Sequence, residues 1–396
     1  METNVRIKNI GLRGVGVADT KISTIDGKNG ILIYRGFRIE DLAESSSFVE
    51  TVYLLLNGSL PNREELEAFS KEMAASRELP SFLYSSLYGW PKTADPMDVL
   101  QASIPLLALA DPELGIETRQ ANVHKAIRLL ARMPSVVAAW NRIRNGLPPL
   151  PPDSALSHAA NFLWQFHGER PDDEMAHDLD VSLMLQAEHT FNASTFACRE
   201  VVSTGAHMYA GAAAGVGALS GDLHGGANAR VMATLAQLEP ELKSEKDVAC
   251  WVSYKLDRGE KIMGMGHPVY KTFDPRSTIL KRIARRMSSK AGQERRYWLL
   301  STIEEACHEE FERRSKPHIK SNVDFYSGLV YSMMGIPVDM MTPIFAMAIA
   351  AGWCAHIIEE KFAEAQEKPA LYRPTADYIG HYCGKMGCVY VPVDER

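Results

Sequence analysis

The chain has 396 residues and a formal net charge of −6, with 46% hydrophobic and 23% charged residues. This negative balance excludes a general nucleic-acid-binding surface, because phosphate binding needs a clear positive excess on at least one face. The length exceeds one average domain, so we expect two lobes with a large core.

The N-terminal residues and the cysteines bear on the compartment. The first residues carry neither the apolar run of a signal peptide nor the pattern of a transit peptide. The six cysteines are scattered and lack the C-x-x-C spacing of zinc or redox motifs. We therefore expect reduced thiols and a cytoplasmic protein.

Residues 24–36 predict the main β structure. They read TIDGKNGILIYRG, in which an Asp-Gly to Asn-Gly turn joins two short β-prone runs. After Gly36 the apolar spacing changes to the helical period, and proline and glycine breakers divide the rest of the chain into segments of helical length. The sequence therefore predicts an all-α fold with a small N-terminal β-hairpin.

Residues 340–358 carry no formal charge and approach the length that spans a bilayer. Thr342, Pro343 and His356 interrupt the stretch, and the residues that close it, 359–361, are more acidic than basic. We interpret the stretch as a buried core helix and expect no membrane partner.

Two loop segments between apolar helices contain a histidine next to glycine. Residues 220–228 read SGDLHGGAN, and the glycines let backbone and ligand approach His224 closely. Residues 264–276 read GMGHPVYKTFDPR and place His267 and Arg276 on one loop, where they can grip a carbonyl oxygen and a carboxylate of one small molecule. The structural alternatives are a helix–helix turn and an Asp-Pro turn with a solvated arginine.

A third segment, residues 322–328 (NVDFYSG), surrounds Asp324 with apolar and aromatic residues that could raise its pKa toward the range of a general base. A simple helix cap is the alternative. Together the three segments suit carbon–carbon bond formation through an enol, because proton removal from a thioester methyl group needs a base and a donor at the carbonyl oxygen. Asp324 and His224 fit those roles, and His267 can donate to the keto oxygen of the electrophile.

The strings LHGGAN, GHPVYKTFDPR and NVDFYSG resemble the three catalytic segments of the citrate synthase family. The resemblance extends from IYRGFRIEDLA near the N-terminus to RPTADYIG and YVPVDER near the C-terminus. It implies a mostly helical two-domain homodimer, with residues 1–220 and 323–396 as the large domain and residues 221–322 as a small domain that closes over the active-site cleft. It also implies that His224, His267 and Asp324 catalyse the condensation of acetyl-CoA with oxaloacetate to citrate and CoA.

The resemblance further implies substrate contacts. The string AEHTFNAS looks like the segment whose histidine binds oxaloacetate, here His189. Arg276 matches the arginine of the DPR element, and Arg373 resembles the carboxylate-binding arginine that reaches the neighbouring subunit's site; both can form paired hydrogen bonds. Lys271 matches a frequent CoA-binding position. The histidines do not form H-E-x-x-H or similar ligand spacing, and the chemistry needs no metal if histidines and backbone groups stabilise the oxyanion, so we expect no metal. We also expect no cofactor, because the CoA thioester is a substrate.

One position departs from the family pattern. Members usually carry arginine four residues before a tryptophan, in a string like SRxxGW, whereas Ile349 precedes Trp353 here. An apolar side chain removes one charge-assisted contact to a carboxylate, worth about 1.5–3 kcal/mol, and Pro268 looks more like the 2-methylcitrate synthase branch. Two alternatives stay open: a 2-methylcitrate or other alkylcitrate synthase with shifted acyl-CoA or 2-oxo acid specificity, and a ligand-binding paralogue with little turnover.

Overall fold

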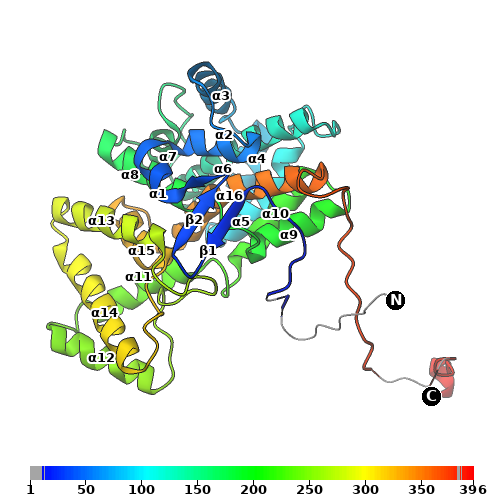
Figure 1. Ribbon diagram of the computed structural model, residues 1–396. Coiled ribbons are helices and arrows are strands. Elements are labelled where there is room, and N and C mark those ends of the chain that lie inside the picture. Colours follow the sequence, from blue (N-terminus) through cyan, green and yellow to red (C-terminus); the bar gives the residue numbers. More distant parts are fainter. Residues whose placement is uncertain (1–10, 13, 381–383, 385) are drawn as a thin grey trace.

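The computed structural model describes residues 11–12, 14–380, 384 and 386–396. Figure 1 shows a helical body with a small sheet and an extended C-terminal segment. The strands are β1 (Ser23–Asp26), β2 (Ile31–Tyr34) and β3 (Phe37–Arg38). The helices of the first half are α1 (Ile39–Ser45), α2 (Phe48–Asn57), α3 (Arg63–Ala75), α4 (Ser81–Gly89), α5 (Pro96–Ala108), α6 (Arg119–Arg144), α7 (His158–His167) and α8 (Asp173–Leu185). Those of the second half are α9 (Ala193–Ser203), α10 (Met208–Ser220), α11 (Ala227–Leu238), α12 (Glu245–Asp257), α13 (Pro275–Lys290), α14 (Glu294–Arg313), α15 (Val323–Met333) and α16 (Met341–Lys361), with 3-10 turns at Val338–Met340 and Val393–Glu395. The predicted all-α class is confirmed.

The N-terminal sheet contains the predicted hairpin and one further strand. β1 and β2 are antiparallel, with Ser23 opposite Tyr34 and Asp26 opposite Ile31. The third strand, Phe37–Arg38, pairs with the end of β2. Two residues are too few for a period-2 pattern to stand out, so the sequence predicted two strands where the structure has three.

Helix α16 is the centre of the larger group of helices. It packs against α2, α5, α6, α8, α9 and α10. By length and composition it could cross a membrane, but the whole of its apolar window is buried inside the protein. The prediction of a buried core helix at residues 340–358 is therefore confirmed.

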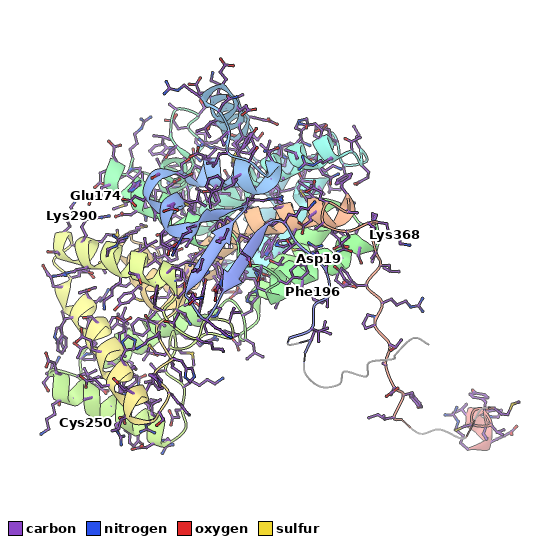
Figure 2. All side chains as sticks on the ribbon, in the orientation of Figure 1. Asp19, Glu174, Phe196, Cys250, Lys290 and Lys368 are labelled. Carbon is purple, nitrogen blue, oxygen red and sulfur yellow. The ribbon has the colours of Figure 1, made fainter. Side chains whose placement is uncertain are left out.

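Helices α11 to α15 form a second group, which lies at the lower left of Figure 1. Within it α12 packs on α14, and α15 packs on both α11 and α13. Ion pairs join the group to α8, because Glu174 contacts Arg286 (Oε1–Nε 2.7 Å) and also Lys290, which Figure 2 labels beside it. A small domain at residues 221–322 stays a prediction, and the packing of α15 extends this group beyond residue 322.

The thiols follow the expectation only in part. Cys198, Cys250, Cys307 and Cys354 are free. Cys388 is disulfide-bonded, which corrects the expectation that every cysteine is reduced. The spacing of the C-terminal cysteines argued against a zinc or redox motif, but it does not prevent a disulfide.

Candidate active site

Side chains from separate parts of the chain meet around His267. The ring centroids of His189 and His267 are 5.1 Å apart, and the Tyr270 ring lies 5.7 Å from the first and 4.9 Å from the second. The structure thus brings the loop that precedes α9 against the loop that precedes α13.

A second set of contacts joins the His267 loop to the start of α15. The Asn322 backbone N–H donates to the Gly264 carbonyl (2.9 Å), and its side-chain amide donates to the Gly266 carbonyl (2.8 Å). Gly264 has φ +78°, and a Cβ there would lie 2.7 Å from a ring carbon of Phe325. This close approach requires glycine and brings the segment that carries Asp324 beside the His267 loop.

The turn of the N-terminal hairpin lies on the outer side of the same loop. The Lys271 backbone N–H donates to the Gly27 carbonyl (2.7 Å), and a Cβ at Gly27 would lie 2.3 Å from the Val269 carbonyl oxygen. Lys271 itself is exposed, and it lines an open cavity of about 1130 Å³ together with Phe191 and Pro268, among other residues. Lys271 is therefore accessible to a ligand in this cavity.

The protonation of His267 is fixed by its own loop. Its Nδ1 accepts hydrogen bonds from the backbone N–H groups of Val269 (3.0 Å) and Tyr270 (3.2 Å), so the proton of the neutral ring is on Nε2. Burial lowers the pKa of His267 to about 4, and the positive charge of Arg276 contributes. His267 is thus a neutral donor through Nε2–H.

His224 has the opposite tautomer. Its Nε2 accepts from the Ser194 backbone N–H (3.2 Å) and lies 2.8 Å from the Ser194 hydroxyl, so the proton of the neutral ring is on Nδ1. Burial lowers the pKa of His224 below its usual value. The indole N–H of Trp353 donates to the same hydroxyl (3.1 Å) and holds Ser194 in place.

Asp324 lies in the first turn of α15, where Asn322 caps the helix by accepting from the Asp324 backbone N–H (2.9 Å). Burial raises the pKa of the Asp324 carboxyl to about 6, although the charge of Arg276 opposes the shift. Its Oδ1 is buried and has no hydrogen-bond partner among the described residues. A carboxylate with this pKa and a free oxygen can act as a general base near neutral pH.

Arg276 is held rigidly by Asp274. The carboxylate accepts from Nε (3.0 Å) and Nη2 (2.8 Å) of Arg276, caps α13, and also accepts from the Val323 backbone N–H (3.1 Å). Burial by itself lowers the pKa of Arg276, but the charge of Asp274 outweighs it, so the pKa is raised. A guanidinium has five N–H donors, and those that Asp274 leaves free can bind a second carboxylate.

His189 is neutral and lacks a partner on one side. Burial lowers its pKa well below the usual value, and the charge of Arg276 adds to the effect. Its Nε2 is buried and has no hydrogen-bond partner among the described residues. His189, His224, His267, Arg276 and Asp324 thus lie in one region, as the sequence predicted.

Arg373 is the predicted site residue that lies elsewhere. It is exposed on the C-terminal segment, next to Tyr372, whose hydroxyl donates to Glu360 (2.9 Å) and whose ring lies 5.5 Å from that of Phe196. Beyond this attachment the segment runs away from the body (Figure 1). Within its own chain Arg373 does not join the cluster of histidines.

The sequence did not identify three residues that contact or hold site side chains: Glu188, Ser194 and Asp274. Asp274 precedes Pro275, a pattern typical of a helix start, and this signal could have identified it as the cap that fixes Arg276. Glu188 and Ser194 act through contacts with distant segments, which no local pattern reveals. No group of three or more metal-ligating side chains occurs in the described part of the chain.

The comparisons with known proteins agree with this geometry. A family model described as citrate synthase, C-terminal domain, matches residues 11–375. A citrate synthase of Haloferax volcanii is 41% identical over 390 residues, which are 98% of each chain. A 2-methylcitrate synthase of Mycobacterium tuberculosis is 39% identical over 371 residues, which are 94% of this chain and 90% of that protein. The citrate synthase structure from Pyrobaculum aerophilum has a TM-score of 0.89 at 36% identity and covers 98% of this chain and 95% of its own. A Thermoplasma acidophilum citrate synthase solved as a ternary complex with carboxymethyl coenzyme A and oxaloacetate has a TM-score of 0.86 at 32% identity and covers 98% of both chains. The chain belongs to the citrate synthase family of enzymes.

Proposed function

We propose that the enzyme condenses acetyl-CoA with oxaloacetate to give citrate and CoA. The observation that carries the proposal is the combination of one carboxyl with a raised pKa, Asp324, with two neutral imidazoles whose free N–H groups are fixed by the backbone, His224 and His267. A base and two separate oxyanion donors are what an enol-mediated condensation needs.

The first step forms the enol. Asp324 removes a proton from the thioester methyl group, and the Nδ1–H of His224 donates to the thioester oxygen, where negative charge develops. Both groups are in the required protonation state at neutral pH, because the pKa of Asp324 is about 6 and that of His224 is lowered by burial.

The second step forms the carbon–carbon bond. The enol carbon attacks the keto carbon of the 2-oxo acid while the Nε2–H of His267 donates to the keto oxygen. Arg276 and His189 bind carboxylate and carbonyl oxygens of the acid, and Lys271 contacts the CoA moiety. Hydrolysis of the resulting citryl-CoA thioester releases CoA and makes the reaction effectively irreversible.

An alkylcitrate synthase activity, such as 2-methylcitrate synthase, is the second candidate. Ile349 is almost fully buried, one helical turn before Trp353, whose indole contacts Ser194 in the site. Residues four apart lie on one face of a helix, so α16 carries the apolar Ile349 on the same face as Trp353. This face lacks the positive charge that an arginine would supply at position 349, which favours an acceptor or donor with an apolar group in place of one carboxylate.

Thiol release distinguishes these functions. Acetyl-CoA and propionyl-CoA are each mixed with oxaloacetate, pyruvate or 2-oxoglutarate, with Asp324→Ala as the blank. CoA release from acetyl-CoA and oxaloacetate supports citrate synthesis. CoA release only from a different pair of acyl-CoA and 2-oxo acid supports an alkylcitrate synthase with shifted specificity. Wild-type protein that is silent with every pair contradicts both and favours the ligand-binding paralogue.

We also propose a cytoplasmic homodimer in which Arg373 completes the neighbouring subunit's site. Two observations support this assembly. The C-terminal segment leaves the body of its own chain (Figure 1), and it exposes the apolar side chains of Leu371, Ile379 and Val389. Apolar surface of this kind is typical of a segment that packs on a partner.

A further inference from the structure

The residue that follows His189 has a strained backbone. Thr190 has φ +53°, in the left-handed region that a β-branched residue rarely adopts. Such a conformation is strained and persists only where surrounding contacts hold it. The contacts that hold Thr190 therefore also determine where His189 lies.

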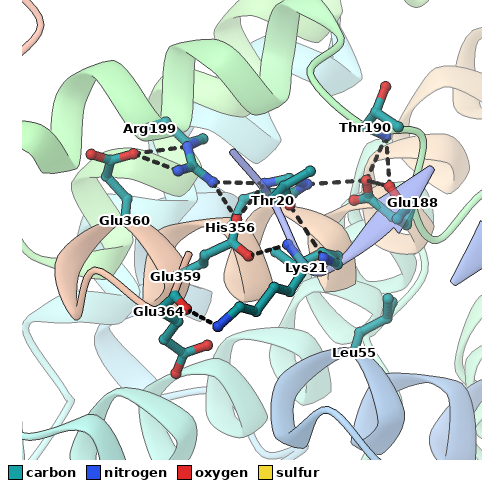
Figure 3. A network of polar contacts seen from close by, with 12 residues as sticks. Thr20, Lys21, Leu55, Glu188, Thr190, Arg199, His356, Glu359, Glu360 and Glu364 are labelled. Carbon is teal, nitrogen blue, oxygen red and sulfur yellow. Dashed lines mark hydrogen bonds and ion pairs between the residues drawn. The ribbon is translucent and has the colours of Figure 1, made fainter. Parts of the chain in front are cut away.

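Glu188 supplies the main contact. Its Oε1 accepts from the Thr190 backbone N–H (2.5 Å) and from the Ser23 hydroxyl (2.8 Å), as Figure 3 shows for Thr190. The same Thr190 N–H also points at the Ser23 hydroxyl oxygen (3.2 Å). The Tyr34 hydroxyl donates to the Glu188 carbonyl oxygen (2.7 Å). Strand β1, strand β2 and the Glu188 carboxylate thus fix the backbone on both sides of His189.

Side chains of α9 and α16 hold the Glu188 carboxylate in place. Arg199 donates from Nη1 to His356 Nδ1 (3.0 Å) and to Glu359 (2.7 Å). Because a guanidinium can only donate, His356 Nδ1 accepts, and its Nε2–H donates to Glu188 Oε1 (3.1 Å). The chain of contacts from Arg199 through His356 to Glu188 is fully buried.

The backbone of helix α16 also lies directly against the carboxylate. A Cβ at Gly352 would lie 2.1 Å from Glu188 Oε2, and the Gly352 backbone N–H donates to the Ala187 carbonyl (2.9 Å). The helix backbone therefore packs directly on Ala187 and on the Glu188 carboxylate, just before His189.

We propose that Glu188, supported by His356, is a positioning residue that holds Thr190 in its strained conformation and thereby directs His189 Nε2 at the 2-oxo acid. The inference rests on the proposed function for the identity of that acid. Glu188 is fully buried and acts through the backbone. His189 presents a buried ring nitrogen that no described protein group occupies.

The test uses four proteins: wild type, Glu188→Gln, Thr190→Gly and the double variant. Glycine adopts positive φ without penalty, so Thr190→Gly removes the strain that Glu188 is proposed to hold. Misplacement of a binding group by about 1 Å can cost 10²-fold. With Thr190 present, we expect Glu188→Gln to raise KM for oxaloacetate about 10- to 100-fold. In the Thr190→Gly background, we expect Glu188→Gln to raise this KM less than about threefold. The KM for acetyl-CoA should be nearly unchanged in both backgrounds. An equal rise in KM in both backgrounds overturns the inference.

Glu360→Gln is the matched control. Glu360 belongs to the same buried network, where it accepts from Arg199 Nε (2.8 Å) and Tyr372 (2.9 Å), but it does not contact the His189 segment. We expect a lower Tm, and we expect any rise in KM for oxaloacetate to be the same with Thr190 present and with Thr190→Gly. Ser23→Ala is a milder second variant, and we expect it to raise KM for oxaloacetate less than Glu188→Gln does. This rise should also disappear when Ser23→Ala is combined with Thr190→Gly. A rise that persists in the Thr190→Gly background contradicts the inference. Calorimetric binding of oxaloacetate to the same proteins makes the comparison without turnover, so failure of this inference and failure of the proposed reaction are separate outcomes.

Discussion

At the scale of single residues, the two imidazoles that we propose as oxyanion donors differ in which nitrogen carries the proton, and backbone N–H groups decide each case. Val269 and Tyr270 donate to Nδ1 of His267, whereas Ser194 donates to Nε2 of His224. Burial keeps both rings neutral, because it lowers the pKa of each. Each histidine is thereby prepared to donate one hydrogen bond to one developing oxyanion.

The pH dependence of turnover follows from Asp324. The Asp324 carboxyl, with a pKa of about 6, is expected to lose its required ionised form as the pH falls from about 7 to about 5. Burial lowers the pKa of both histidines below the usual value, which favours their neutral forms. We expect kcat/KM for acetyl-CoA to fall about tenfold per pH unit below about pH 6 and Asp324→Asn to lower kcat by about 10²- to 10⁴-fold. Steady-state kinetics from about pH 5 to about pH 8 check both. A flat acid limb in the wild type contradicts the role of Asp324 as base.

At the scale of elements, α16 fixes the site through the residues that face the loop before α9. Trp353 contacts Ser194, His356 contacts Glu188, and Gly352 lets the helix backbone reach Ala187. The long apolar helix is thus both the centre of the core and the support of the loop before α9.

Gly352→Ala tests this packing. The new methyl group would lie 2.1 Å from Glu188 Oε2 and 2.7 Å from the Ala187 carbonyl oxygen, so helix and loop must separate. We expect a loss of about 1–3 kcal/mol in the free energy of unfolding together with a higher KM for oxaloacetate. The control is Gly89→Ala at the end of α4, where a Cβ meets nothing within 4 Å. Similar denaturation midpoints and KM values for the two variants contradict the packing argument.

Local sequence patterns predicted the helices and strands well, but they did not predict which distant segments contact one another. The glycines beside His224 and His267 and the apolar neighbours of Asp324 are visible in single segments, and the helical period is visible throughout. Glu188 could not be identified in this way, because its role depends on Ser23 and His356, which lie far away in the sequence. The two-residue strand β3 was missed because it is too short to show a period.

At the scale of the whole molecule, the proposed homodimer assigns the C-terminal segment a place in the neighbouring subunit's site. Arg373 lies on this segment, outside the histidine cluster of its own chain. In a homodimer with twofold symmetry each segment can reach the other subunit's site in the same way.

Mixed dimers test this assembly. Asp324→Asn and Arg373→Ala subunits should each be impaired alone, but a hybrid dimer has one site that lacks both defects. Co-expression of the two variants should restore about a quarter of wild-type activity, because about half of the dimers are hybrids with one intact site each. Absence of any recovery, with Arg373→Ala impaired by itself, shows that Arg373 acts within its own chain or not at the site.

The most direct test of the proposed chemistry follows the methyl carbon. Acetyl-CoA labelled with ¹³C at the methyl group is incubated with oxaloacetate and enzyme, and the products are identified by ¹³C NMR, with Asp324→Asn in parallel. We predict labelled citrate from the wild type and at least about 100-fold slower formation by the variant. Labelled acetate without citrate, or equal rates from the two proteins, contradicts an enol-forming condensation at Asp324.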